Sequence, residues 1–169
     1  TFFKMKNLFF LGTLILFLAA CGHVSFVSPQ PEFVDALTEI PEKYHGEFLI
    51  DKDWDKKTHA VTSSTINGIS IGSDSLVVKE RGNYFYINTI NDSGYYELSI
   101  IRLTKFLNHE SISLYDPGAL LDNIDQLKLF NIVISNQEDD KELVLDNVTV
   151  NQLSILTNSS EKYKVKRLK

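Results

Sequence analysis

Short stretches rich in Ile, Val, Tyr, Phe and Thr follow one another from Tyr44 onward, and polar turns separate them. These residue types favour β-strands, and the Gly, Asn, Asp and Ser between them favour tight turns. The connections are too short for the crossovers that parallel strands need, so the pattern predicts an antiparallel meander or a partly closed barrel. The expected strands cover 45–50, 58–66, 75–80, 84–90, 95–103 and 111–115.

A first short helix is expected where this pattern breaks. Asp116-Pro117 fits a helix start, because Asp caps helices and proline suits the first helical position. Leu120, Ile124 and Leu127 would then form one apolar stripe. A strand is expected next, over 128–135.

A second short helix is expected near the end of the chain. Thr149 and Gln152 have the spacing of a capping box, which favours a helix over 149–157. The β-branched residues of this segment leave a strand as the alternative. With strands at 142–146 and 163–168, the fold class is mainly β, a β-rich α+β domain with two short helices.

The segment from Tyr84 to Ile90 is apolar on both faces of the expected strand. Even-numbered residues would line one face and odd-numbered residues, Phe85 to Thr89, the other. Cross-strand packing in a core explains this pattern. The alternative is the wall of an apolar pocket, with Tyr84, Tyr86 and Tyr96 facing a ligand.

The N-terminal part has a different character. Leu8 to Ala20 is an uncharged run of 13 residues that follows Lys4 and Lys6. It has the length of a signal-peptide core, ~7–15 residues, and is shorter than the ~20 that a spanning helix needs. We therefore expect a signal peptide at 1–20, cleaved between Ala20 and Cys21. A flexible tether at 21–41, with three of the four prolines, and a single β-rich domain at 42–169 would follow.

Cys21 is the single cysteine of the chain, so a disulfide within the exported domain is impossible. Leu18-Ala19-Ala20-Cys21-Gly22 resembles the lipobox of bacterial lipoproteins. This resemblance implies a diacylglyceryl group on Cys21 and a membrane held through covalent lipid, which anchors stably when several acyl chains are present.

The chain as a whole resembles small envelope lipoproteins of the Bacteroidota. The resemblance rests on the lipobox and on Pro41–Gly46, Asp74–Lys79, Tyr84–Asn88 and Tyr163–Leu168. It implies a cell-envelope protein at the outer membrane and no particular activity. In such proteins an acidic run after the cysteine directs surface export. Here Gly22–Phe26 has no acid, which favours the periplasmic side.

The charge of the chain excludes some partners. The net charge is −5, and it becomes −7 without residues 1–20, which hold two lysines and no acid. An acidic domain is poorly suited to nucleic acid or to electrostatic docking on anionic lipid. The four histidines lack the spacing of a zinc motif, so no metal and no cofactor is expected.

Two motifs imitate known sites. Gly68-Ile69-Ser70-Ile71-Gly72 matches the G-x-S-x-G of serine hydrolases, but strand and turn residues follow where that elbow needs a helix. Asp51, Asp53 and Asp55 imitate a calcium loop without its glycine and its closing glutamate. We expect neither a catalytic serine nor a calcium site.

Asp74-Ser75-Leu76 resembles the Asp-Ser/Thr-aliphatic signal for O-glycosylation of exported Bacteroidota proteins, which makes Ser75 a candidate modification site. For function, the first expectation is a non-enzymatic envelope module that binds an unidentified partner protein. The second is a lipocalin-like carrier of a small apolar ligand in the barrel interior, and an envelope hydrolase is a distant third. A contiguous cavity would favour the carrier, and a filled core with an exposed apolar patch the partner-binding module.

Overall fold

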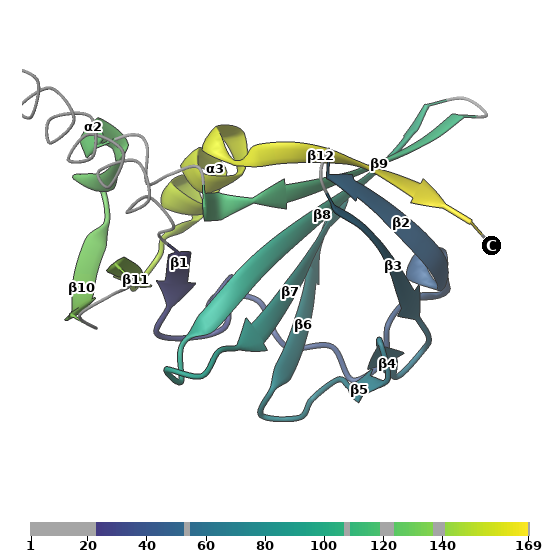
Figure 1. Cartoon of the computed structure of the whole chain (residues 1–169), viewed down its shortest axis with the longest axis horizontal. Helices are drawn as coiled ribbons and strands as arrows, with labels where there is room; N and C mark the ends of the chain where they lie inside the picture. The colour runs from purple at the N-terminus through teal and green to yellow at the C-terminus, as the bar shows by residue number, and fades with distance from the viewer. Residues whose placement is uncertain (1–22, 53–54, 107–108, 119–123, 137–140, 169) are drawn as a thin grey trace, which may run out of the picture.

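The computed structural model describes residues 23–52, 55–106, 109–118, 124–136 and 141–168. Across these ranges, 12 strands form one mixed sheet that curves strongly and does not close into a barrel (Figure 1). The prediction of a mainly β fold with short helices is confirmed.

The strands are β1 (His23–Phe26), β2 (Gly46–Lys52), β3 (Asp55–Val61), β4 (Thr65–Ile66), β5 (Ile69–Ser70), β6 (Leu76–Arg81), β7 (Tyr84–Ile90), β8 (Tyr96–Phe106), β9 (His109–Asp116), β10 (Asn131–Asn136), β11 (Lys141–Asp146) and β12 (Glu161–Arg167). The helical segments are the 3₁₀ helix η1 (Glu42–Tyr44), α2 (Ile124–Leu127) and α3 (Val150–Ser159).

Two parts of the sheet are meanders. β2, β3, β4 and β5 pair antiparallel in chain order. β6, β7, β8 and β9 pair antiparallel in chain order. The last strand, β12, then lies between β9 and β2 and joins the two halves of the curved sheet. β1 pairs antiparallel with β8 and parallel with β11, a pairing that the sequence pattern did not predict.

The two faces of the curved sheet carry separate cores. The outer face packs under α3, β1 and β11, around Phe26, Tyr86, Ile100 and Leu156. The inner face holds a second cluster that includes Ile40, Tyr44, Val78 and Phe85. The sequence-based expectation that β7 is central and apolar on both sides is therefore confirmed.

Residues 27–44, here called the strap, fold round the free edge of β6. Asn88 on β7 holds Gln30, because its Oδ1 accepts from the Gln30 backbone N–H (2.6 Å) and its Nδ2 donates to the Gln30 carbonyl (2.8 Å). Further along, Leu37 N–H donates to the β6 carbonyl of Val78, and Ile40 N–H to Ser63 beyond β3. The strap thus links the edge of β6 to the turn between β3 and β4, and Figure 1 shows it running from β1 past β6 toward β4.

The predicted flexible tether over 21–41 is therefore wrong for residues 23–41. Phe26 and Gln30 are fully buried and Ile40 nearly so. Lys79 is also buried, and its ammonium donates to the carbonyls of Pro29 and Pro31 at 2.9 Å each. Burial lowers the pKa of Lys79, and nearby Glu32 and Asp35 act in the opposite direction. Prolines and serines marked this segment as irregular, but the buried side chains hold it on the sheet.

The helix expected at 149–157 is confirmed as α3. The Thr149 side chain accepts from the Gln152 backbone N–H, and the Gln152 side chain accepts from the Thr149 N–H, so both bonds of the capping box are present. Leu153 and Leu156 face the outer-face core, whereas Val150 is exposed. Local capping thus prevails over the β-branched residues of this segment.

The helix start expected at Asp116 is confirmed for the residues that the structure describes. Asp116 is the last residue of β9 and pairs with Glu161 of β12. Its Oδ1 accepts from the Gly118 N–H (3.0 Å), and Pro117 and Gly118 have 3₁₀-helical conformation, so Asp116 caps a turn of helix. Residues 119–123, Leu120 among them, lie outside the described residues, and α2 follows them.

Candidate functional site

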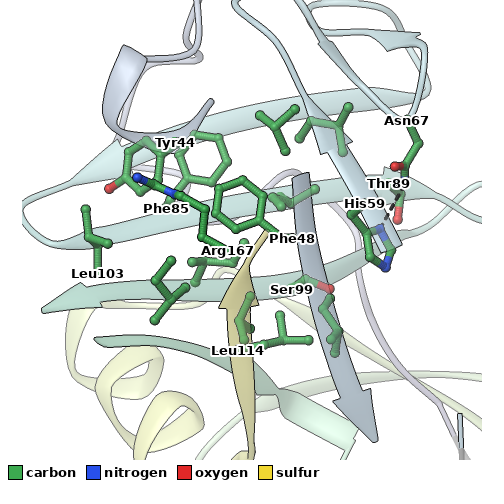
Figure 2. Close-up of a pocket in the computed structure, with 17 residues that line it drawn as sticks. Tyr44, Phe48, His59, Asn67, Phe85, Thr89, Ser99, Leu103, Leu114 and Arg167 are labelled. Carbon is green, nitrogen blue, oxygen red and sulfur yellow. Dashed lines mark hydrogen bonds between the residues drawn. The ribbon is translucent and has the colours of Figure 1, made fainter. Parts of the chain in front are cut away.

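The inner face of the curved sheet encloses an apolar cavity of about 210 Å³ (Figure 2). Its walls come mainly from alternate residues of six strands, because side chains at every second position share a face. The lining residues are Tyr44 of η1, Phe48 and Ile50 of β2, His59 and Val61 of β3, Ile66 of β4, Asn67 of the turn after β4, Phe85, Ile87 and Thr89 of β7, Ser99, Ile101 and Leu103 of β8, Ile112 and Leu114 of β9, and Val165 and Arg167 of β12.

Strand register places these residues in rows across the sheet. Phe85 lies opposite Ile101, and Ile101 lies opposite Leu114 on the next strand. On the other side, Arg167 lies opposite Phe48, which lies opposite His59. The wall is therefore continuous across β7, β8, β9, β12, β2 and β3.

One side of the cavity is closed by Tyr44. Its ring stacks on Phe85 with centroids 4.4 Å apart, and its hydroxyl donates to Glu80 at 3.2 Å. Burial raises the pKa of Tyr44 well above its usual value, and the Glu80 carboxylate adds to this effect. Tyr44 is thus a neutral, fixed part of the wall.

Arg167 is held near Tyr44. Its Nη2 donates to the backbone carbonyl of Lys43, its Nη1 lies 3.3 Å from a Glu110 carboxylate oxygen, and its guanidinium lies over the Phe48 ring. Its Nε is buried and has no hydrogen-bond partner among the described residues. Because Glu110, the Lys43 carbonyl and the Phe48 ring hold the Arg167 guanidinium, we assign Arg167 a structural role.

The opposite side of the cavity carries a histidine–asparagine pair. His59 Nδ1 lies 2.8 Å from Asn67 Nδ2, and Figure 2 shows this pair beside Thr89 in the view. Asn67 is exposed, so the cavity reaches the surface here. Burial lowers the pKa of His59, and the nearby positive charge of Lys57 lowers it further. The imidazole is consequently neutral at neutral pH.

The tyrosines predicted to face a ligand lie outside this cavity. Tyr84 and Tyr86 are on the outer face, where Tyr86 belongs to the core under α3, and Tyr96 packs against the same core. Tyr84 and Tyr86 border a shallower, more polar groove beside α3, together with Arg81 and Arg102. The face of β7 that lines the cavity is the one of Phe85, Ile87 and Thr89.

The inner-face residues were missed although their alternation was visible in the sequence. Phe48 and Ile50, Ile101 and Leu103, and Ile112 and Leu114 each recur with period two. The signal that could have found them is this shared alternation across strands. On β7 and β8 the side that stays hollow cannot be read from it, because the outer positions there are also apolar and pack under α3.

The other predicted sites have these locations. Ala20 and Cys21 lie outside the described residues. Ser75 is exposed in the turn before β6, where its Oγ lies 3.1 Å from Ser73 Oγ, and its glycosylation stays a prediction. Ser70 is exposed on β5, and a turn follows it as the sequence indicated. Asp51 pairs with Lys56 across the β2–β3 hairpin at 3.3 Å.

Two features are absent from the described ranges, a membrane-spanning helix and a cluster of metal-ligating side chains. None of their helices is long and apolar enough to cross a bilayer. Nor do three or more His, Cys, Asp or Glu side chains in these ranges gather in an arrangement that would hold a metal ion. Comparison with protein families, curated proteins and solved structures finds no match to this chain.

Proposed function

We propose that this chain is an envelope lipoprotein whose β-rich domain binds a small apolar ligand in the inner-face cavity. The observation that carries the proposal is the cavity itself, since 11 of its 17 lining residues are Phe, Ile, Leu or Val. Apolar concave sites with a few placed polar groups are the usual form of small-molecule pockets. On the strength of the cavity, we propose the carrier in preference to the partner-binding module that the sequence alone favoured.

The volume sets the size of the ligand. An apolar cavity of about 150 Å³ binds benzene. By proportion, about 210 Å³ accommodates a ligand of about eight non-hydrogen atoms, such as a substituted single ring. A full-length fatty acid is too large for the cavity as it stands.

The proposed anchor is the lipid on Cys21. In support, the sequence joins an apolar run to a cysteine in a lipobox-like context, and β1 begins only two residues later, at His23. With so short a connection, the lipid would hold the domain directly at the membrane, with the periplasmic face of the outer membrane as the proposed location.

Calorimetry with toluene tests the cavity. For a ligand of this size we expect a dissociation constant of roughly 1 mM or below, which corresponds to about −4 kcal/mol or stronger. Ile87→Trp should abolish binding, because it places an indole in the cavity. Ile90→Trp is the matched control, since Ile90 is on the same strand and exposed on the outer face. Equal toluene affinity in the two variants, or none in the wild type, would refute the proposal.

Metabolic lipid labelling tests the anchor. Cys21→Ser in the full chain should lose the label and leave the membrane fraction, or accumulate as uncleaved precursor. A variant that is processed and remains with the membranes like wild type would show that the lipobox interpretation is wrong.

A further inference from the structure

We propose that the cavity selects an amphipathic ligand that carries one hydroxyl group, held by His59, Thr89 and Ser99. This inference rests on the proposed function, because it assigns a ligand class to the same cavity. It comes from three polar residues of a mostly apolar wall. The other polar residues of the wall, Tyr44, Asn67 and Arg167, already have partners within the protein.

The hydrogen-bonding role of His59 follows from its neighbour. Asn67 Oδ1 accepts from the Ala60 backbone N–H at 2.9 Å, which fixes the orientation of the side-chain amide. Asn67 Nδ2 must then donate to His59 Nδ1, 2.8 Å away. A neutral imidazole whose Nδ1 accepts carries its proton on Nε2. His59 therefore offers an N–H donor that has no partner among the described residues.

Two hydroxyls complete the set. Thr89 and Ser99 are on adjacent strands, where Thr89 lies opposite Glu97 and Ser99 opposite Ile87. Ser99 is thus diagonal to Thr89 on the inner face, at a separation that side chains commonly bridge through a ligand or water. Neither hydroxyl is hydrogen-bonded to another described residue, although both line the apolar cavity. Both side chains are half-buried, so their hydroxyls are accessible to a ligand in the cavity.

These groups match a hydroxyl better than other ligand head groups. A ligand hydroxyl can accept from the N–H of His59 and exchange a hydrogen bond with Thr89 or Ser99. A carboxylate would lie beside a neutral imidazole instead of a cation, and two of the three nitrogens of the Arg167 guanidinium are already bound, by Glu110 and by the Lys43 carbonyl. A phenol or a short branched alcohol has both the required size and the required group.

The test compares p-cresol, toluene and 4-methylbenzoate in the full domain by calorimetry. These probes share a methyl-substituted ring and differ in the polar group. We expect p-cresol to bind at least tenfold more tightly than toluene, and 4-methylbenzoate more weakly than p-cresol. Thr89→Val and Ser99→Ala should each reduce the p-cresol advantage about threefold to tenfold and leave toluene affinity nearly unchanged. Thr104→Val is the matched control, because Thr104 is exposed on the outer face of β8.

The outcomes separate the two proposals. Toluene and p-cresol of equal affinity would overturn the hydroxyl assignment and leave the apolar site standing. The same holds if 4-methylbenzoate binds most tightly, or if Thr104→Val matches the two cavity variants. If none of the three probes binds, both proposals fail together.

Discussion

Single buried polar side chains hold the strap in place, and Asn88 is the main one. It is fully buried and bonds both the N–H and the carbonyl of Gln30, and it also donates to the Val77 carbonyl at 3.2 Å. In the sequence, Asn88 follows Tyr-Phe-Tyr-Ile and looks like one more strand residue. Its role depends on a partner 58 positions away, which no local pattern predicts.

Asn88→Ala tests this clamp. The variant leaves the N–H and the carbonyl of Gln30 buried without partners, so we expect the free energy of unfolding to fall by about 2–4 kcal/mol. Asn83→Ala, in the exposed turn between β6 and β7, should change it by less than about 0.5 kcal/mol. Urea denaturation of both variants measures this, and similar midpoints would contradict the assigned role.

His59 makes a second residue-level prediction, this time about pH. Its pKa is lowered in the folded protein, so the unfolded chain binds this proton more readily. Stability should therefore fall as the pH drops below about 6.5, the value for an unperturbed histidine, and be unaffected by this group at higher pH. His59→Gln should remove that part of the pH dependence. Urea denaturation of both proteins between pH 5 and 8 measures the free energy of unfolding. If this free energy depends on pH in the same way in the wild type and in the variant, the pKa of His59 is not lowered by folding.

At the level of elements, the sequence correctly predicted those strands and helices whose ends are determined by neighbouring turn and capping residues. Strand β7 begins and ends where the sequence predicted it, at Tyr84 and Ile90, because a glycine turn and an Asn-Asp-Ser-Gly turn bound an apolar run. Helix α3 follows from its capping box. The strap was interpreted as a tether because its hydrogen-bond partners, and the residues that bury its side chains, belong to strands far away in the sequence.

Removal of residues 22–41, which include β1 and most of the strap, tests whether this segment is a folded part of the domain or a flexible tether. A chain that begins at residue 42 lacks Phe26 and Ile40, and full burial of each such side chain stabilises by about 1.5–3 kcal/mol. It also leaves the edge of β6 unpaired, which favours aggregation. We expect this variant to be unfolded or aggregated by circular dichroism and light scattering, whereas a chain that begins at residue 22 stays folded. Identical melting curves for the two chains would support the interpretation of this segment as a flexible tether.

For the whole molecule, curvature and the placement of α3 decide which apolar face is filled. α3, β1 and β11 cover the outer face, whereas the inner face is only partly closed by Tyr44 and the strap. The alternation of residues along β7 indicated two apolar faces. Which of them becomes a filled core and which a cavity depends on the face against which α3 packs. The sequence therefore indicated a pocket wall on β7, which does line the cavity, but the tyrosines proposed for it lie on the opposite face of this strand.

The central claim is that a small apolar ligand occupies the inner face. The most direct measurement is the set of nuclear Overhauser effects between bound toluene and methyl-labelled protein. The account predicts contacts to Ile101 and Leu114, which line the cavity, and none to Leu98 and Ile100, their neighbours on the outer face. Contacts to the Leu98 and Ile100 methyls, or no contacts at all with toluene at its solubility limit, would contradict it.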